Sequence, residues 1–584
     1  MKKLAFHRAA LICSTLLLAL LSAPRSEAFQ KTTPAASTAP SANDPLLNAL
    51  VTELERSKEK LRLPDMQAPY FIEYRVFDDD EYSVAASFGA VNALARVHTR
   101  ILSVTARVGD YKQDSYLGFG SNMVDLMPLE NDTLALRHAI WLSTDLAYKR
   151  AVQSFAMKQA ALRNFQEVQP VDDFSHEPPL ESIANTVTLD LGDRDWPKLM
   201  ESVSGMYTKD PQLDALHSMV RFAAVNRYLV NTEGTRVRRS QAIYQLNVSM
   251  TTQAVDGMRL ARAYGKTRTD VHELPSYAEI TRATGELIAS LQSLRQAPPV
   301  KDEYRGPVLF SPDASASVIN ELVADSVTGV KPRPGSNQRT EGDYGNSYKG
   351  RVFPDFVTII DDPSLTSYRD HALIGGYAVD DEGVKAQTVT LVDKGVLVNY
   401  LIGRAPIRDF PQSNGHGRIG FSAFGFLPEP HVSNLIVQSS TTVQAAEMKK
   451  KLIETCRQRG LPFGYYVETM ASPISADRSA FGESNRSKDQ SDSDILAPRL
   501  LYKVFVSDGH EELVRGAEFG ELDTRALRTE IVAMGDDLDV RNSNDPMPYS
   551  IVSPSILFDE LEVKESEATK EKLPQYPAPV IGAQ

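Results

Sequence analysis

Residues 318–329 read V-I-N-E-L-V-A-D-S-V-T-G, and the interpretation of the whole sequence depends on them. At about 100° per residue their apolar side chains fall on one arc of a helix. The polar side chains Asn320, Glu321 and Asp325 fall on the opposite arc. The pattern predicts a short amphipathic helix. A polar helix face exposed to solvent explains the three polar residues without any catalytic role. The alternative is that they form the remnant of a catalytic site, or a site that does not use zinc.

The N-terminus reads as a targeting segment. Basic residues at positions 2, 3 and 8 precede an apolar run over 11–21, and Ser26-Glu27-Ala28 fits a small-x-small cleavage signal. We therefore predict a signal peptide over 1–28 and a disordered leader over 29–43, which is rich in Pro, Ala, Ser and Thr. The apolar run is short for a bilayer, and no later stretch reaches about 18 apolar residues. We expect an exported protein, periplasmic or secreted, with no membrane span after cleavage.

The charge of the chain excludes one class of partner. The full chain carries a net charge of −13, and residues 1–28 hold four basic residues and one acidic residue, so their removal leaves −16. An acidic surface repels phosphate backbones, so we expect no nucleic-acid partner. Cleavage also removes Cys13 and leaves Cys456 as the one cysteine, so we expect no intrachain disulfide.

The hydrophobic patterns predict an α+β protein. Alternating apolar and polar residues over 70–116 indicate antiparallel strands, and helical periodicity recurs over 134–166 and 277–296. These features predict an α/β N-terminal domain over 44–297. Short alternating runs and tight turns then predict an antiparallel, β-rich C-terminal domain over 298–556. The Lys-, Glu- and Pro-rich segment 557–584 is predicted to be a disordered tail.

Several short patches resemble the TldD/TldE (PmbA) family, whose members are also known as modulators of DNA gyrase. They occur in the family's order and spacing across about 70–545: Y-L-V-N-T-E-G at 228–234, G-P-V-L-F at 306–310, D-D-E-G-V at 380–384 and S-N-G-H-G-R at 413–418. The resemblance implies a two-domain metallopeptidase fold that dimerises around a proteolytic chamber. In the family's active branch a helix carries His-Glu-x-x-x-His, and a cysteine nearer the C-terminus completes a zinc site. The other branch lacks the histidines and acts as a partner subunit.

The resemblance places this chain near the second branch. Asn320 and Asp325 stand at the two histidine positions, and Glu321 stands at the glutamate, the one candidate catalytic residue. A neutral amide is a poor zinc ligand, and a single carboxylate does not hold zinc. Cys456 lies too early in the chain to be the expected cysteine. We therefore predict no metal ligands and no cofactor. Zinc would be bound only if the protein is an active metal-dependent peptidase, the first alternative given below.

These expectations give a leading hypothesis and two alternatives. The leading hypothesis is an exported, non-catalytic subunit or peptide-binding relative in proteolytic processing. It would bind a peptide or an unfolded protein segment and form a dimer with itself or with a TldD-like paralogue. The first alternative is an active metal-dependent peptidase with unidentified ligands and Glu321 as general base. The second is a structural or interaction protein of the cell envelope.

Two further polar groups admit a functional and a structural interpretation. Asp361-Asp362 with 380–382 could bind a hard cation, although Asx-type turns explain them more simply. Residues 414–418, N-G-H-G-R, could line a peptide channel, but we interpret them as a glycine-rich surface loop.

Overall fold

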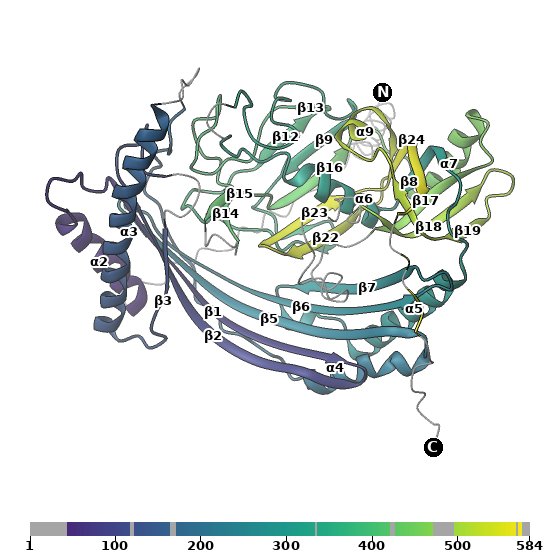
Figure 1. The fold of residues 1–584 in the computed structure, drawn as a ribbon, viewed down its shortest axis with the longest axis horizontal. Helices are drawn as coiled ribbons and strands as arrows, with labels where there is room; N and C mark the ends of the chain where they lie inside the picture. The colour runs from purple at the N-terminus through teal and green to yellow at the C-terminus, as the bar shows by residue number, and fades with distance from the viewer. Residues whose placement is uncertain are drawn as a thin grey trace, which may run out of the picture. The chain divides into compact units, whose positions relative to one another are not determined.

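The computed structural model describes residues 44–116, 122–163, 171–332, 336–420, 427–470, 496–567, 570 and 572–574. The predicted signal peptide and leader lie outside these residues. The α+β class is confirmed, since helices and largely antiparallel sheets alternate along the chain (Figure 1). None of the described helices is long and apolar enough to span a membrane.

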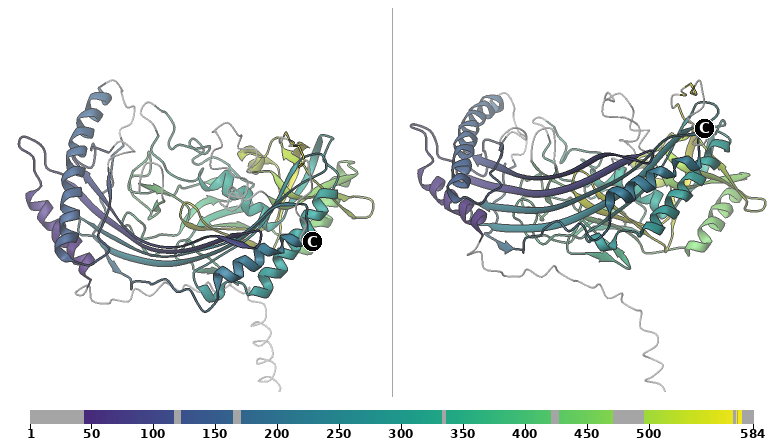
Figure 2. Two further views of the ribbon diagram at one scale, coloured as in Figure 1. Left: turned by 60° about the horizontal axis from the view of Figure 1, so that its bottom comes forward. Right: turned by 90° about the horizontal axis from the view of Figure 1, so that it is seen from below.

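One large sheet dominates residues 44–297. Its strand order is β3-β2-β1-β5-β6-β4, with β7 paired to β6, and all pairs except β4–β6 are antiparallel. The long strands curve together in Figures 1 and 2. Their bounds are β1 Phe71–Ser87, β2 Ala90–Arg107, β3 Asn122–Leu126, β4 Glu181–Ile183, β5 Leu213–Asn231, β6 Arg236–Gln253 and β7 Arg259–Arg268. The predicted strands over 70–116 are confirmed as the β1–β2 hairpin.

Helices pack at both ends of this sheet, and each α-helix starts at a side-chain cap. Asp44, Asp132 and Asp195 accept hydrogen bonds from first-turn N–H groups, and Ser276 forms a capping box with Glu279. Apolar residues of α2 and α3 join one core, and those of α4 and α5 join another. The bounds are α2 Pro45–Lys60, α3 Thr133–Leu162, α4 Trp196–Ser204, η2 Gly205–Lys209, η3 Val271–Glu273 and α5 Tyr277–Gln296.

Residues beyond 297 form two larger sheets and two short ribbons. The first sheet has the order β13-β12-β9-β16-β23-β22, and the second β19-β18-β17-β8-β24-β20 with β21 on β24. The strands are β8 Tyr304–Phe310, β9 Val357–Asp361, β10 Ser367–Tyr368, β11 His371–Ala372, β12 Val389–Asp393, β13 Val396–Leu397, β14 Gly417–Ile419, β15 Pro428–Pro430, β16 Asn434–Ser439, β17 Phe463–Met470, β18 Pro498–Phe505, β19 Glu511–Val514, β20 Ala517–Phe519, β21 Ile531–Met534, β22 Asp539–Asn544, β23 Pro548–Ser553 and β24 Ile556–Glu565. The helices are α6 Pro312–Ile319, the π-helix η4 Asn320–Ala324, α7 Ala445–Gln458 and α9 Thr524–Thr529.

Strand β24 corrects the predicted start of the tail at 557. It pairs antiparallel with β8, with a register shift between Phe558 and Leu561, and buries apolar side chains such as Phe558, Leu561 and Val563. Charged residues between them gave this segment the composition of a disordered tail. They occupy the opposite face of a strand whose apolar face completes the core.

Helices α6 and α7 pack on opposite faces of the sheet that contains β8 and β17. Successive side chains of a strand point to opposite faces. Val308 and Phe310 pack in the core that contains α6, whereas Leu309 packs in the cluster that contains α7. A layer of sheet therefore separates the two helices.

Candidate functional site

The segment with the degenerate motif follows a buried helix. Ser311 caps α6: its Oγ accepts from the N–H of Ala314 at 3.1 Å and donates to the carbonyl of Glu468 at 2.7 Å. Pro312 suits the first helical turn because its nitrogen needs no partner there. The regular helix therefore begins earlier than the predicted 318, and its small Ala and Ser residues hid the periodicity. From Asn320 to Ala324 the backbone widens into a π-helix, a local form frequent at functional sites.

The polar face of this segment is only partly solvated. Asp325 is exposed, but Asn320 and Glu321 are half-buried. The amide Nδ2 of Asn320 donates to Glu321 Oε1 at 2.9 Å. The expected solvated face therefore holds for Asp325 and not for the other two residues. An amide nitrogen stands beside the glutamate where the family motif has an imidazole.

Two aromatic side chains complete this neighbourhood, which we call the motif cluster: Asn320, Glu321, Asp325, His431 and Tyr549. The rings of His431 and Tyr549 lie 5.2 Å apart. Burial raises the pKa of Tyr549, and the charges of Glu321 and Asp325 raise it further. Burial lowers the pKa of His431, whose Nδ1 lies 3.0 Å from the carbonyl of Val432. The cluster thus holds two carboxylates and a histidine that burial keeps neutral.

Cys456 is remote from the motif cluster. It lies on α7, is fully buried among Leu452 and Met448, and faces the opposite side of the sheet from α6. Burial raises the pKa of its thiol to about 11, so the thiolate needed for metal binding is disfavoured. Its role is to fill the core beneath α7.

The acidic residues at 361–362 and 380–382 are buried and partnered. Asp361 faces His416 Nε2 at 3.0 Å and accepts from the N–H of Ser433 at 2.9 Å. Asp380 accepts from the N–H groups of Glu382 and Val384, which is the predicted Asx-type turn. The turn prediction is therefore confirmed, with buried partners that the sequence did not reveal.

Asp381 is the centre of a buried ionic network. It receives Arg239 at 2.7 Å and Arg227 at 3.1 Å, and Arg418 lies 3.9 Å away. Burial raises its pKa, but the three guanidinium charges outweigh that effect and hold the pKa far below its usual range. Since Arg227 and Arg239 belong to β5 and β6, the network fastens the turn at 380–383 to the large sheet.

The segment 414–418 is not a surface loop. His416 and Arg418 are almost fully buried, at 0% and 2% exposure. The Arg418 guanidinium lies 4.5 Å from the centre of the Tyr377 ring, and its NH2 donates to the carbonyl of Pro548 at 2.8 Å. The glycine at 417 is required because a Cβ there would lie 2.0 Å from Glu382 Oε2. The prediction of a glycine-rich surface loop is therefore wrong.

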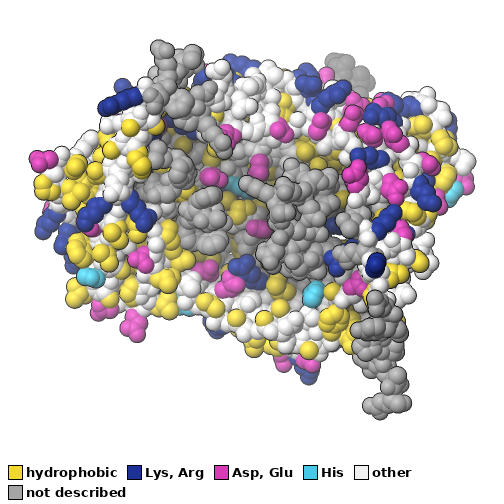
Figure 3. Space-filling view, in the orientation of Figure 1, with side chains coloured by type: hydrophobic (Ala, Val, Ile, Leu, Met, Phe, Trp, Pro, Cys, Tyr) yellow, Lys and Arg dark blue, Asp and Glu magenta, His cyan; other side chains and the backbone are white. Residues whose placement is uncertain are grey.

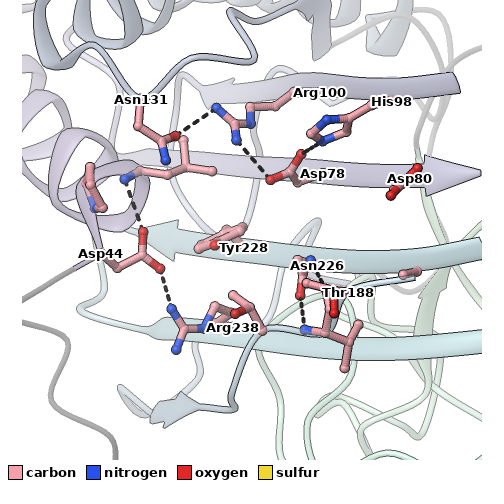
Figure 4. Close-up of a pocket in the computed structure, with 15 residues that line it drawn as sticks. Asp44, Asp78, Asp80, His98, Arg100, Asn131, Thr188, Asn226, Tyr228 and Arg238 are labelled. Carbon is pink, nitrogen blue, oxygen red and sulfur yellow. Dashed lines mark hydrogen bonds and ion pairs between the residues drawn. The ribbon is translucent and has the colours of Figure 1, made fainter. Parts of the chain in front are cut away.

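A hollow of about 500 Å³ lies on the face of the large sheet that carries Asp78 and Asp80 (Figure 4). Its charged side chains are already paired. Asp78 meets His98 at 2.7 Å and Arg100 at 2.9 Å, while Asp44 pairs with Arg238. A hollow whose charges satisfy one another offers little to a charged ligand.

Comparison with known proteins fits this geometry. Residues 303–480 match the family described as the PmbA/TldA metallopeptidase C-terminal domain. Residues 303–480 belong to the TldD/PmbA family. The predicted resemblance is thereby confirmed, and the match includes the motif segment and the acidic residues at 361–362 and 380–382.

Individual relatives agree with the TldD/PmbA assignment. A metalloprotease of Methanothermobacter thermautotrophicus is 25% identical over 208 residues, which are 35% of this chain and 42% of that protein. A metalloprotease TldD homologue of Buchnera aphidicola is 27% identical over 129 residues, which are 22% and 24% of the two chains. The chain thus covers less than half the length of these relatives. The crystal structure of TldE from Thermococcus kodakarensis shares the fold, with a TM-score of 0.54, 11% identity, and coverage of 88% of this chain and 100% of that one.

The side chains present do not fit the zinc site that the TldD/PmbA family implies. Catalytic zinc takes about three protein ligands and a water molecule. The motif cluster offers an amide already hydrogen-bonded to Glu321, and Cys456 lies across the sheet. Within the described ranges no group of three or more His, Cys, Asp and Glu side chains is placed to hold a metal ion.

One polar feature escaped the sequence interpretation. Residues 78–81 read D-D-D-E in the middle of β1, where four consecutive acidic residues are unusual for a strand. Alternation sends Asp78 and Asp80 to one face of the sheet and Asp79 and Glu81 to the other. The acidic run at 78–81 could therefore have predicted charged sites on both faces of the large sheet.

Proposed function

We propose that this protein is a peptide-binding member of the TldD/PmbA family that has lost the family's metallopeptidase chemistry. The observation that carries the proposal is the donor set of the motif cluster. Asn320 and Asp325 replace the two imidazoles, and Asn320 is engaged by Glu321. Glu321 could accept a proton, but no described ligand set would hold a metal ion and its water beside it.

A strand at the edge of a sheet supports the peptide-binding part of the proposal. Among the described strands, β22 pairs with β23 alone and ends its sheet. It lies beside α6, because Arg541 NH1 on β22 donates to Ser317 Oγ at 2.8 Å. An edge strand presents unpaired backbone groups to which an extended peptide can add as a further strand. A peptide added there would run beside the motif segment.

The charge of the molecule favours a peptide over a nucleic acid as partner. The chain has a net charge of −13, and Figure 3 shows basic and acidic side chains interspersed over the right-hand part of the visible face. We extend the proposal to export through the signal peptide at 1–28, and to a dimer with a second copy or a TldD-like paralogue. Export would place the protein where peptides and unfolded segments of other exported proteins occur.

Binding and cleavage can be separated with one substrate. A fluorescein-labelled casein peptide, mixed with the purified protein and zinc, should show saturable anisotropy and remain intact by mass spectrometry. Addition of 1,10-phenanthroline should change neither result. Cleavage that phenanthroline and Glu321→Gln both abolish would establish the metal-dependent peptidase instead. Absence of binding to casein and to other unfolded peptides would contradict the peptide-binding role.

A further inference from the structure

A second cavity, of about 360 Å³, lies on the other face of the large sheet, opposite the hollow of Figure 4. Its floor is formed by alternate residues of β1, β5 and β6, including Asp79, Val225 and Gln241, which stand side by side in register. Its roof is formed by Ile419 and the turn 544–548. The cavity is within the usual size range of small-ligand sites, about 300–1,000 Å³.

Most charged groups in this cavity already have partners. Glu81 binds Arg221 through two hydrogen bonds of 2.9 and 2.8 Å. Arg227 and Arg239 are held by Asp381, outside the cavity wall. Gln241 donates to the carbonyl of Ile374 at 3.0 Å. These residues are fixed. Two carboxylates remain: Asp545 in the roof is exposed to solvent, so the less exposed one is left to be explained.

Asp79 is that carboxylate. Its Oδ1 is buried, and no described donor lies within hydrogen-bonding distance of it. Its neighbours in the acidic run are all paired: Asp78 with His98 and Arg100, Asp80 with Arg96, and Glu81 with Arg221. Burying a carboxylate without a partner is costly, so an unfilled position of this kind marks a place for a ligand group.

The charges around Asp79 indicate which kind of ligand group would complement it. Burial raises the pKa of Asp79, the charges of Glu81 and Asp80 add to the increase, and Arg221 and Arg227 oppose it, so that the net pKa is about 6. Arg239 on β6 and Asp545 in the roof complete the charged groups around the cavity. At neutral pH Asp79 is therefore an anion that lacks a charged hydrogen-bond donor. An ammonium or guanidinium group is the strongest complement to such an oxygen.

We propose that this cavity binds a cationic nitrogen group of a peptide, either its N-terminal ammonium or a basic side chain, with the Asp79 carboxylate as the acceptor. The peptide as ligand rests on the proposed function, whereas the affinity for a cationic nitrogen does not. Val225 stands beside Asp79 in the sheet register and Gln241 stands beside Val225, so both would contact the ligand's uncharged part.

The test uses the full mature chain and four tripeptides measured by calorimetry: Ala-Lys-Ala, its N-acetylated form, Ala-Ala-Ala, and N-acetyl-Ala-Ala-Ala with an amidated C-terminus. n-Butylamine serves as a probe that does not depend on peptide recognition. We expect the cationic probes to bind at least about tenfold more tightly than the uncharged one. Whichever of lysine and N-terminus accounts for that difference identifies the source of the cation. Binding should weaken between pH 7.5 and pH 5, as Asp79 takes up a proton.

Variants assign the effect to the cavity. Asp79→Asn should remove the preference for cationic probes, and Val225→Phe should weaken all of them by filling the space. Asp80→Asn, on the opposite face, is the matched control and should bind like the wild type. Binding that Asp79→Asn leaves unchanged would overturn this inference while preserving the proposed peptide-binding function. Binding of n-butylamine without any tripeptide would support the cavity and count against the peptide. No binding of any probe would overturn the inference.

Discussion

The charged residues of the motif cluster and those of the network around Asp381 lie in two different environments. Asn320, Glu321 and Asp325 stand at the positions of the family's catalytic motif, where Asn320 and Glu321 are half-buried and Asp325 is exposed. Asp381 stands in what reads as an ordinary turn, yet it is buried and held by several arginines. In this protein we expect the residues at the catalytic positions of the family to contribute little to stability. Asp381, in a turn with no obvious role in the sequence, links the C-terminal half to the large sheet.

The strongest test of this contrast is Asp381→Ala. The substitution leaves Arg227, Arg239 and Arg418 without their common acceptor, so we expect a loss of about 3–5 kcal/mol in the free energy of unfolding. Urea titration followed by tryptophan fluorescence measures it. Because its pKa is depressed in the folded state, Asp381 stabilises fully above about pH 4, and this contribution declines as the pH falls further.

The control for that experiment is Asp393→Ala, which removes an exposed carboxylate from β12. It should change the urea midpoint little. Equal midpoints for the two variants would mean that the network contributes nothing, and the contrast between the regions would disappear.

Gly417→Ala probes the same network through its packing. The new Cβ would lie 2.0 Å from Glu382 Oε2, which is buried and cannot move aside easily. We expect a loss of about 1–3 kcal/mol from overpacking. Gly285→Ala in α5 is the matched control, because a Cβ there meets no atom within 4 Å. It should be neutral or raise the melting temperature through helix propensity. A larger loss at 285 than at 417 would refute the packing argument.

Asp79→Asn extends the comparison to a half-buried carboxylate whose Oδ1 has no hydrogen-bond partner among the described residues. In the folded protein its pKa is raised to about 6, against about 4 when unfolded, so charging it costs stability as the pH rises through this interval. The variant should therefore be about 1–2 kcal/mol more stable than the wild type at pH 7.5, and equal to it at pH 4. Thermal unfolding at both values measures the difference. A variant that is less stable at pH 7.5 would show that Asp79 has a favourable partner.

The smallest effects are expected in the motif cluster itself. Glu321→Gln and Asp325→Ala should each change the free energy of unfolding by less than about 1 kcal/mol, since neither residue anchors the core. Differential scanning calorimetry is sufficient. A large loss at either position, especially one that depends on added zinc, would show that the segment is constrained after all.

Local patterns predicted much of the fold. Helix α5 coincides with the expected 277–296, and the antiparallel strands expected over 70–116 form the β1–β2 hairpin. Strand β24 was missed because its charged face dominated its composition. The burial of His416 and Arg418 could not be inferred locally, since their partners Asp361 and Asp381 are distant in sequence.

The candidate site could likewise be predicted only in part. Local patterns placed Asn320 and Glu321 at the motif positions but did not show that both side chains are half-buried. The cavity at Asp79 arises from strands that are adjacent only in the folded sheet. The run at 78–81 signalled charge on both faces, but not which carboxylate would lack a partner.

Metal stoichiometry tests the central claim most directly. The mature protein, exposed to excess zinc and then dialysed without chelator, can be assayed by inductively coupled plasma mass spectrometry beside Glu321→Gln and Asp325→Ala. A family fold without the family's metal site predicts far less than one zinc per chain, with no difference between the wild type and the variants. One zinc per chain in the wild type, lost in either variant, would contradict the account and restore the metallopeptidase.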